Sequence, residues 1–202
     1  MRVLVVRHGE THWNRERRMQ GWAPSQLTEA GQEQARVTGE RLAAEYDISH
    51  IYASDLTRTR ETTALIRESV AAAVTFDAAW RERDLGVYQG LTYDDITERF
   101  PEFSLQRAGL EAAAKVPDGG ESIVQVRERV LGGWQELTAN GHDDDTVLVV
   151  SHGGPLYLLL GHLQGHDIVE SYMRMNLQNC AVSEIAVEDG DARVVRENET
   201  PY

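Results

Sequence analysis

Apolar and polar positions divide the chain into short apolar runs and longer amphipathic segments. Residues 3–6 form a continuous run rich in β-branched side chains, which predicts a strand buried on both faces. Residues 146–150 have the same character and predict a second buried strand. Near the end of the chain, residues 181–187 and 192–196 are expected to form a hairpin that turns at Asp189-Gly190.

A further strand candidate, His50–Ala53, and several helices lie between these strands. Thr28 is expected to cap a helix that runs to about Tyr46, because an apolar stripe follows this hydroxyl residue. The other predicted helices span residues 56–70, 93–99, 104–114, 122–137 and 155–163. Strands that alternate with helices predict an α/β fold, a three-layer sandwich with a mostly parallel central sheet flanked by helices. Residues 1–202 are expected to form a single domain, with a small helical insert at about residues 91–116.

Composition narrows the class of protein. The 202 residues are 41% hydrophobic and 26% charged, as in a soluble globular protein, and no apolar run approaches the roughly 18 residues of a membrane helix. Cys180 is the single cysteine, so an intramolecular disulfide and a thiolate metal cluster are excluded. The apolar start is too short for a signal peptide, and a cytoplasmic location is expected.

The chain is strongly acidic, with a net charge of −13 and a single lysine, Lys115. Such a chain repels nucleic acids and anionic membranes, so neither is expected as a partner. Solubility is the ordinary explanation of this acidity, and adaptation to a high-salt cytoplasm is the sharper alternative. An anionic substrate would have to be attracted by a local group of arginines, because the field of the whole chain opposes its approach.

One segment of the sequence occurs almost unchanged a second time. Residues 3–9 read VLVVRHG and residues 147–153 read VLVVSHG, so each predicted strand ends in a histidine followed by a glycine. Ligands bind at the carboxyl ends of strands in open α/β sheets, so we expect His8 and His152 to face one crevice. Each glycine would allow a sharp turn and leave amide N–H groups free for a ligand. The alternative is that both histidines only form local hydrogen bonds, but the repeated context and the neighbouring Arg7 favour a functional site.

The residues around the first histidine point to a known family. Arg7-His8-Gly9-Glu10-Thr11, followed by Trp13-Asn14, resembles the signature of the histidine phosphatase superfamily, which includes the cofactor-dependent phosphoglycerate mutases. The resemblance continues in the same order over nearly the whole chain. Its other parts are Gln20-Gly21-Trp22, residues 27–35, residues 53–62, Glu82 to Gly86 and Ser151-His152-Gly153-Gly154.

The resemblance implies a role for each residue that carries the chemistry. His8 would be the nucleophile that forms a phosphohistidine, and a hydrogen bond to its other ring nitrogen should fix the tautomer. Arg7 and Arg58 would hold the phosphoryl oxygens. An alkoxide is a poor leaving group, so a general acid is needed, and the family pattern assigns this role to Glu82.

Neutral groups would complete the site. His152 is expected to donate a proton or a hydrogen bond to the transferring group. Asn14 and the amide of Gly153 would add further donors, and Gln20 and Gly21 would contact the substrate. The helical insert is expected to lie over this active site.

Neither a metal nor another cofactor is implied. His162 and His166 have the spacing of a zinc-binding helix, but Gln164-Gly165 is expected to end the helix, so both are predicted to lie in a loop or at the surface. The only partner expected is a small phosphorylated substrate. Dimers occur in this family, and the sequence does not decide between a monomer and a homodimer.

Three functions remain open, and a phosphatase is favoured over a phosphoglycerate mutase or a non-catalytic binder of phosphorylated ligands. Compared with mutases, Asp84 and Leu85 replace His and Tyr, and Tyr93 stands where a lysine is expected. No Arg-Arg pair occurs between residues 102 and 116, and Gly154-Pro155 replaces Asn-Ser. Each departure weakens the binding of a second phosphate. The presence of all the main site residues argues against a non-catalytic binder.

Overall fold

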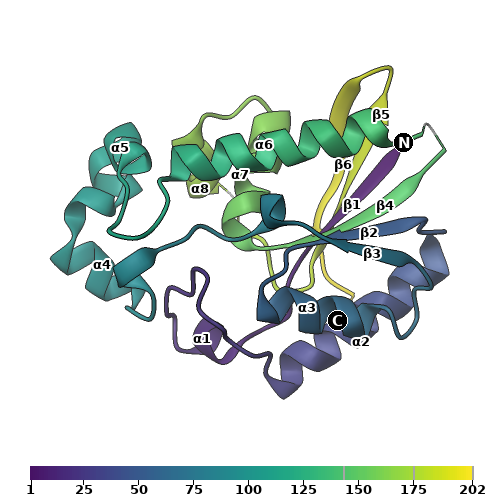
Figure 1. Ribbon diagram of the computed structural model, residues 1–202, viewed down its shortest axis with the longest axis horizontal. Helices are drawn as coiled ribbons and strands as arrows, with labels where there is room; N and C mark the ends of the chain where they lie inside the picture. Colours follow the sequence, from purple (N-terminus) through teal and green to yellow (C-terminus); the bar gives the residue numbers. More distant parts are fainter. Residues whose placement is uncertain (143, 175, 202) are drawn as a thin grey trace.

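The computed structural model describes residues 1–142, 144–174 and 176–201, and its centre is a six-stranded sheet (Figure 1). The strand order is β3-β2-β4-β1-β5-β6. The first four strands in that order pair in parallel, while β5 pairs antiparallel with both β1 and β6, so the expectation of a mostly parallel sheet is confirmed. The strands are β1 (Arg2–Arg7), β2 (His50–Ala53), β3 (Ala73–Phe76), β4 (Thr146–Ser151), β5 (Val182–Glu188) and β6 (Asp191–Glu199).

Helices cover both faces of the sheet, which gives the predicted three layers (Figure 1). One face is covered by α2 (Glu29–Glu45) and α3 (Thr57–Ile66), and the other by α6 (Ile123–Asn140) and α7 (Gly153–Leu163). The shorter helices are α1 (His12–Arg15), α4 (Tyr93–Arg99), α5 (Leu105–Ala114) and α8 (Ile168–Arg174), with 3₁₀ turns at Ala78–Trp80, Gly86–Tyr88 and Pro101–Phe103.

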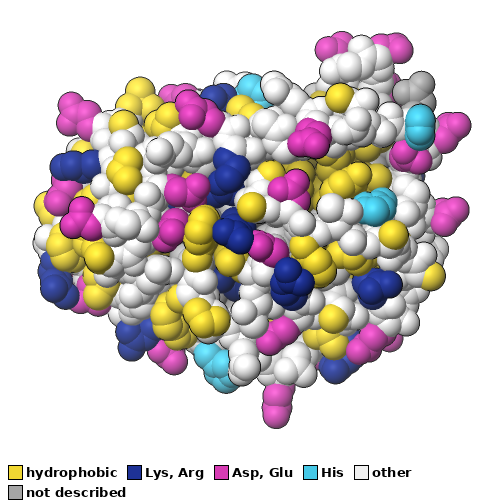
Figure 2. Space-filling view, in the orientation of Figure 1, with side chains coloured by type: hydrophobic (Ala, Val, Ile, Leu, Met, Phe, Trp, Pro, Cys, Tyr) yellow, Lys and Arg dark blue, Asp and Glu magenta, His cyan; other side chains and the backbone are white. Residues whose placement is uncertain are grey.

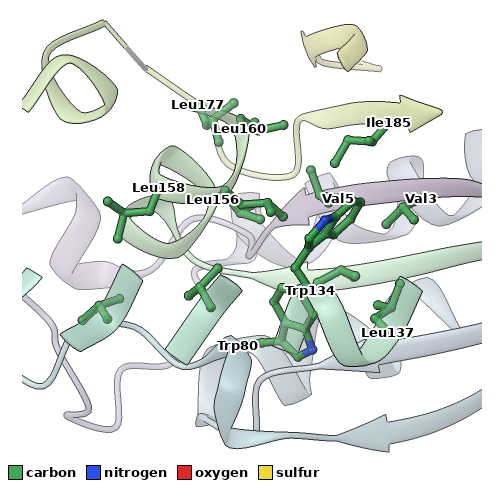
Figure 3. Packing of buried hydrophobic residues seen from close by; sticks show 14 of the residues in the cluster. Val3, Val5, Trp80, Trp134, Leu137, Leu156, Leu158, Leu160, Leu177 and Ile185 are labelled. Atoms are coloured by element: carbon green, nitrogen blue, oxygen red, sulfur yellow. The ribbon is translucent and has the colours of Figure 1, made fainter. Parts of the chain in front are cut away.

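Along the central strands, successive side chains belong in turn to two hydrophobic clusters, because they point to opposite faces of the sheet. Val3 and Val5 pack with Trp134 of α6 and with the leucines of α7 (Figure 3). Leu4 and Val6 belong to a second cluster on the opposite face, with α2 and α3. Both sets are fully buried, which explains why this strand is apolar at every position.

The observed ends of several helices differ from the predicted ends by up to about one helical turn. Thr28 does cap α2, since its hydroxyl accepts the Gly31 N–H. The helix expected over residues 56–70 ends at Ile66, where hydrogen bonds of shorter span replace the helical pattern. The helix expected over 122–137 continues to Asn140, and the one expected over 155–163 already begins at Gly153.

Three elements had no counterpart among the predicted ones: α1, β3 and α8. The strand β3 is an edge strand whose residues are mostly exposed, so its apolar pattern is weak. The helices α1 and α8 have only four and seven residues, too few for a periodic pattern to stand out.

The insert packs onto the body through aromatic residues. Tyr88 contacts the rings of Phe100 and Phe103, with ring centroids 4.6 and 5.0 Å away. His162, expected in a loop or at the surface, lies in the last turn of α7 and is exposed. In the described part of the chain, no helix is long and apolar enough to cross a membrane. No cluster of three or more potential metal ligands occurs there either.

Candidate active site

A cavity of about 160 Å³ opens at the carboxyl ends of β1 and β4. We divide its lining by side-chain type, without implying a gap between the two sets, and call the first set the histidine end: Arg7, His8, Asn14, Gln20, Arg58 and Gly153. The tyrosine end consists of Arg18, Arg83, Leu85, Tyr93, Tyr157 and Tyr172. Glu82, Met19, Gly21 and Gly154 complete the lining. Acidic side chains are scattered over the molecular face in Figure 2, so this group of arginines contrasts with the charge of the whole chain.

The pairing of the two repeated strands brings the two histidines together. β1 and β4 are parallel and in register, with Val6 opposite Val150 and Arg7 opposite Ser151. The His8 N–H extends this pairing by donating to the Ser151 carbonyl at 3.0 Å. The rings of His8 and His152 consequently lie with their centroids 5.2 Å apart, as the repeated motif predicted.

His8 is held in the tautomer that a nucleophile requires. Its Nδ1 lies 2.8 Å from the Gly9 carbonyl, which can only accept, so Nδ1 carries the proton and Nε2 keeps its lone pair. Burial lowers the pKa of His8 well below its usual value, and the positive charges of Arg58 and Arg7 lower it further. The imidazole is therefore neutral and nucleophilic at physiological pH.

The glycines that follow the two histidines have different roles, and the prediction was wrong for the first. The Gly9 N–H donates to the Thr62 hydroxyl at 3.0 Å, so it is not free for a ligand. Gly9 is required because a Cβ there would lie 2.4 Å from the Gly31 carbonyl oxygen. Gly153 instead begins α7 and lines the cavity, so its N–H belongs to a helix N-terminus that favours anions.

Arg58 lines the cavity and is 1% exposed. Its Nε donates to Nδ1 of His152 at 3.1 Å, and one Nη donates to the Gly21 carbonyl at 2.8 Å. Burial lowers the pKa of Arg58 to about 10, which still leaves the guanidinium charged at neutral pH. Gly21 therefore contributes its carbonyl, which fixes the direction of Arg58.

Both ring nitrogens of His152 already have partners in the protein. Nδ1 must accept because the Arg58 Nε–H can only donate, so the single proton of the neutral ring is on Nε2. Nε2 lies 2.8 Å from the Ser54 hydroxyl, and burial lowers the pKa of His152 well below its usual value. The structure therefore does not support the predicted direct donation from His152 to a ligand. In this arrangement, His152 orients Arg58.

Arg7 is held by a loop that the sequence did not single out. One Nη donates to the Leu177 carbonyl at 2.6 Å, and its Nε is buried without a partner among the residues described. The same loop fixes the backbone here, because the Cys180 N–H donates to the Arg7 carbonyl and the Asn179 amide to the His8 carbonyl, each at 2.8 Å. The Nε of Arg7 is therefore a preset donor.

Asn14 and Gln20 are oriented by one threonine. Thr11 caps α1, and the Asn14 side-chain oxygen accepts the Thr11 backbone N–H at 3.0 Å. The Gln20 side-chain oxygen accepts from the Thr11 hydroxyl at 3.1 Å. With both oxygens engaged, the NH₂ groups of these two amides remain as neutral donors for the cavity that they line.

Glu82 lines the cavity, and its charge acts on both Arg58 and Arg83. Its carboxylate accepts the Arg83 N–H at 2.8 Å and the Gly154 N–H at 3.3 Å. A Cβ at position 154 would lie 2.4 Å from the Glu82 carboxylate and 2.8 Å from the Tyr172 hydroxyl oxygen. Glycine at this position therefore leaves the space that the carboxylate occupies.

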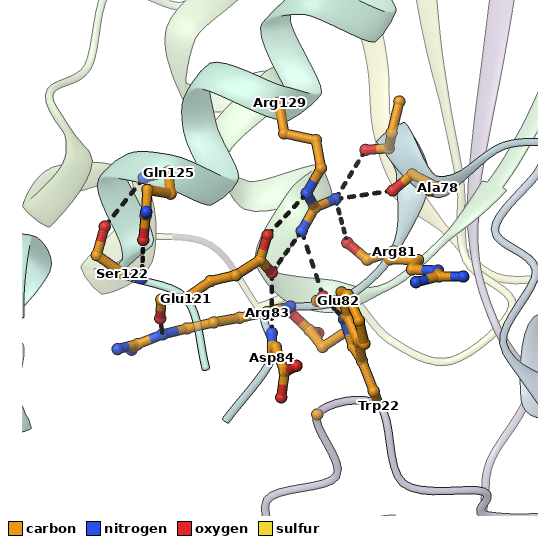
Figure 4. Close-up of polar contacts among 12 residues, drawn as sticks. Trp22, Ala78, Arg81, Glu82, Arg83, Asp84, Glu121, Ser122, Gln125 and Arg129 are labelled. Atoms are coloured by element: carbon orange, nitrogen blue, oxygen red, sulfur yellow. Dashed lines mark hydrogen bonds and ion pairs between the residues drawn. The ribbon is translucent and has the colours of Figure 1, made fainter. Parts of the chain in front are cut away.

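A half-buried ion pair between Arg129 and Glu121 supports the segment that carries Glu82 (Figure 4). Arg129 of α6 donates to the Glu121 carboxylate at 3.1 and 2.9 Å. The Glu121 carboxylate also accepts the Asp84 N–H at 3.0 Å. Arg129 further donates to backbone carbonyls of the segment, those of Ala78, Ala79, Arg81 and Glu82. These contacts hold a segment that contains a 3₁₀ turn but no α-helix or strand.

Three tyrosines from separate helices form the other end. Tyr93 belongs to α4, Tyr157 to α7 and Tyr172 to α8, and the rings of the last two meet edge to face with centroids 5.7 Å apart. Burial raises the pKa of Tyr172 well above its usual value, so its hydroxyl stays protonated. Tyr93 is the part of the insert that reaches the cavity lining.

Comparisons with known proteins agree with this site. Residues 3–200 match the histidine phosphatase superfamily (branch 1). A probable phosphoglycerate mutase GpmB of Citrobacter koseri is 37% identical over 192 residues, which span 94% of this chain and 86% of that protein.

Two solved structures show the same fold. Bacillus stearothermophilus YhfR superimposes with a TM-score of 0.88 at 32% identity, covering 98% of this chain and 97% of that one. A mycobacterial glucosyl-3-phosphoglycerate phosphatase in complex with VO3 gives a TM-score of 0.83 at 29% identity, covering 98% and 99%. With its family match, relatives and site geometry in agreement, this chain belongs to the histidine phosphatase superfamily (branch 1).

Proposed function

We propose that this protein is a metal-independent phosphomonoesterase that hydrolyses small phosphorylated metabolites through a phosphohistidine on His8. One observation carries the proposal: Nδ1 of His8 is tied to the Gly9 carbonyl, which leaves the Nε2 lone pair in a cavity lined by Arg7 and Arg58. A neutral imidazole between two guanidinium groups is suited to attack a phosphoryl group whose oxygens those cations hold.

In the first step, Nε2 of His8 attacks phosphorus in line and the bond from phosphorus to the ester oxygen breaks. Arg7 and Arg58 stabilise the charge on the phosphoryl oxygens, and the amides of Asn14 and Gly153 add neutral donors. Glu82 enters this step protonated and gives its proton to the departing oxygen, so that an alcohol leaves.

In the second step, the carboxylate of Glu82 takes a proton from water, and the resulting hydroxide oxygen attacks the phosphohistidine. The bond between phosphorus and Nε2 of His8 breaks, inorganic phosphate leaves, and both His8 and Glu82 return to their starting forms. His152 acts indirectly, because it holds the Nε of Arg58 and thereby sets the direction of that guanidinium.

Phosphoglycerate mutase is the second candidate, and the relatives named probable phosphoglycerate mutase support it. A mutase would return the phosphoryl group to an organic acceptor and would need further cations for a second phosphate. The insert brings Tyr93, and not a cation, to the cavity lining. This favours transfer to water.

The experiment is hydrolysis of p-nitrophenyl phosphate with and without EDTA, beside a coupled phosphoglycerate mutase assay. We expect hydrolysis that the chelator does not affect, inhibition by vanadate, and little mutase activity. Dominant mutase activity would favour the second candidate, and neither activity would indicate a binding protein. Hydrolysis lost with EDTA and restored by a metal would contradict the metal-independent mechanism.

A further inference from the structure

Three segments that are distant in the sequence meet at the cavity lining. The loop 20–23 contributes Gly21, the first turn of α3 contributes Arg58, and the segment 80–83 contributes Glu82. Under the proposed function, Arg58 holds the phosphoryl group and Glu82 protonates the oxygen that leaves it. The two side chains must therefore be placed accurately relative to each other, and the contacts between the three segments determine that placement.

Two of the three connections use arginines. One Nη of Arg58 donates to the Gly21 carbonyl at 2.8 Å, which joins α3 to the loop. Arg81 donates from Nε and one Nη to the two carboxylate oxygens of Asp55, each at 2.6 Å. This pair joins the segment 80–83 to the residues just before α3, in the bidentate geometry in which a guanidinium and a carboxylate fix each other's direction.

Trp22 makes the third connection. Its indole Nε1 donates to the Glu82 carbonyl at 2.7 Å and joins the loop to the segment 80–83 (Figure 4). The guanidinium of Arg81 lies over the Trp22 ring, 4.5 Å from its centroid, so the arginine that holds Asp55 also contacts the indole. Each pair of segments is therefore joined directly.

The connection through Trp22 is the one that ties Glu82 to the loop that holds Arg58. Arg58 has a second anchor, because its Nε donates to His152 at 3.1 Å. The Glu82 carbonyl also accepts from Arg129, but this hydrogen bond is longer, at 3.3 Å, and it ties the segment to α6. Trp22 lies outside the cavity lining, so its effect on the reaction must pass through the residues it contacts.

We propose that Trp22 is a positioning residue, whose indole N–H sets the place of the general acid Glu82 relative to Arg58. This inference rests on the proposed function. Without the N–H, Arg58 keeps its bond to His152, whereas the Glu82 carbonyl keeps only the longer bond from Arg129. Loss of the N–H should therefore impair protonation of the leaving oxygen more than binding of the phosphoryl group.

The test uses Trp22→Phe, which removes the N–H and keeps an aromatic ring beneath Arg81. Release of the alcohol in the first turnover is measured with glycerol 3-phosphate and with p-nitrophenyl phosphate, because the first turnover reports the step in which Glu82 is the acid. With saturating glycerol 3-phosphate we expect a rate about threefold to tenfold lower, the size of one neutral hydrogen bond. The apparent Kd should hardly change, and release of nitrophenolate should keep its rate, because this group leaves without protonation.

A double variant separates positioning from a general structural role. Glu82→Gln cannot donate a proton, so adding Trp22→Phe to it should cause no further loss with glycerol 3-phosphate. Trp134→Phe is the matched control: it makes the same substitution in the hydrophobic cluster that Val3 and Val5 share with α6 and α7. It should lower Tm and leave the ratio of the two first-turnover rates unchanged.

The outcomes separate this inference from the proposed function. Unchanged rates in Trp22→Phe, equal losses with both substrates, or losses that multiply in the double variant would overturn the inference alone. Failure of the unaltered enzyme to hydrolyse either phosphomonoester would overturn the proposed function itself. Equal losses with both substrates in Glu82→Gln would also count against the proposed function, because they would remove the acid that Trp22 is inferred to position.

Discussion

The two ends of the cavity are built in different ways. At the histidine end, His8 follows the strand β1, and Gly153 begins a helix directly after the parallel strand β4. At the tyrosine end, Arg83 lies in a segment with 3₁₀ turns, and the tyrosines come from three separate helices. The difference indicates that the sheet fixes the backbone at His8 and Gly153, while the second end depends on local supports. Under the proposed function, the first end would carry out phosphoryl transfer and the second would determine the substrate.

Removing the nucleophile should have the largest effect. His8→Ala removes the Nε2 lone pair, and we expect turnover to fall by about 10⁴-fold or more in a steady-state assay with p-nitrophenyl phosphate. His162→Ala is the matched control, because His162 is exposed on α7 and should be replaceable at no cost in rate. Near-normal turnover by the His8 variant would refute the mechanism.

Arg58 and His152 should behave as one unit. Arg58→Gln removes a preset charge from the phosphoryl group and should lower kcat/KM by about 10²–10³-fold. His152→Gln should cost less, because His152 acts by orienting Arg58. The double variant should then be no slower than Arg58→Gln alone. Effects that multiply in the double variant would show that His152 acts on the substrate independently.

Glu82 links the two ends, and its effect should depend on the leaving group. Glu82→Gln cannot donate a proton, so we expect a loss of about 10²–10⁴-fold with an alkyl phosphate. The loss should be much smaller with p-nitrophenyl phosphate, because nitrophenolate leaves without protonation. Equal losses with both substrates would rule out Glu82 as the general acid.

The Arg129–Glu121 ion pair supports the segment that carries Glu82. Breaking it should give a rate loss that also depends on the leaving group but is smaller. Arg129→Met breaks the bonds that hold the segment 78–84, and we expect about a tenfold loss with alkyl phosphates and little change with p-nitrophenyl phosphate. Arg127→Met, two residues earlier on α6, serves as the control. A uniform loss with both substrates would indicate general destabilisation and not a misplaced acid.

The smallest expected effect is a change in folding stability with pH. His8 and His152 are neutral and buried, with lowered pKa values, while the unfolded chain takes up protons on its histidines below about pH 6.5. Stability should therefore decrease as the pH falls through that value, and the decrease should be shallower in His8→Asn. NMR of the His8 ring should show no titration near pH 6.5. A His8 resonance that titrates there would contradict the buried neutral ring.

The sequence predicted the histidine end well, because its residues occur in contiguous motifs. The two strand–His–Gly segments and a parallel sheet are enough to predict that His8 lies beside His152, and the two rings do lie next to each other. The sequence could not show which hydrogen-bond partner each polar group has. The Gly9 N–H is taken by Thr62, which is 53 residues away, and both nitrogens of His152 are occupied by residues of the strand–helix segment after β2.

At the tyrosine end, the comparison with mutases singled out only Leu85 and Tyr93, and the other residues could not be predicted because they share no local signal. Tyr157 lies in an apolar helix and looks like a core residue, and Tyr172 lies in α8, which is too short for a clear pattern. Arg129 has the ordinary appearance of a charge on an amphipathic helix, and only the fold shows that it supports the Glu82 segment. Arg83 is one of many arginines until its burial is known.

The most direct test of the account is to trap the phosphorylated enzyme. The protein is mixed with substrate, quenched in alkali within the first turnovers, digested, and analysed by mass spectrometry to locate the phosphoryl group. We predict phosphate on the His8 ring of the unaltered enzyme and none in His8→Asn. Phosphate on another residue, or turnover without any phosphorylated enzyme when the breakdown step is slowed, would contradict the central claim.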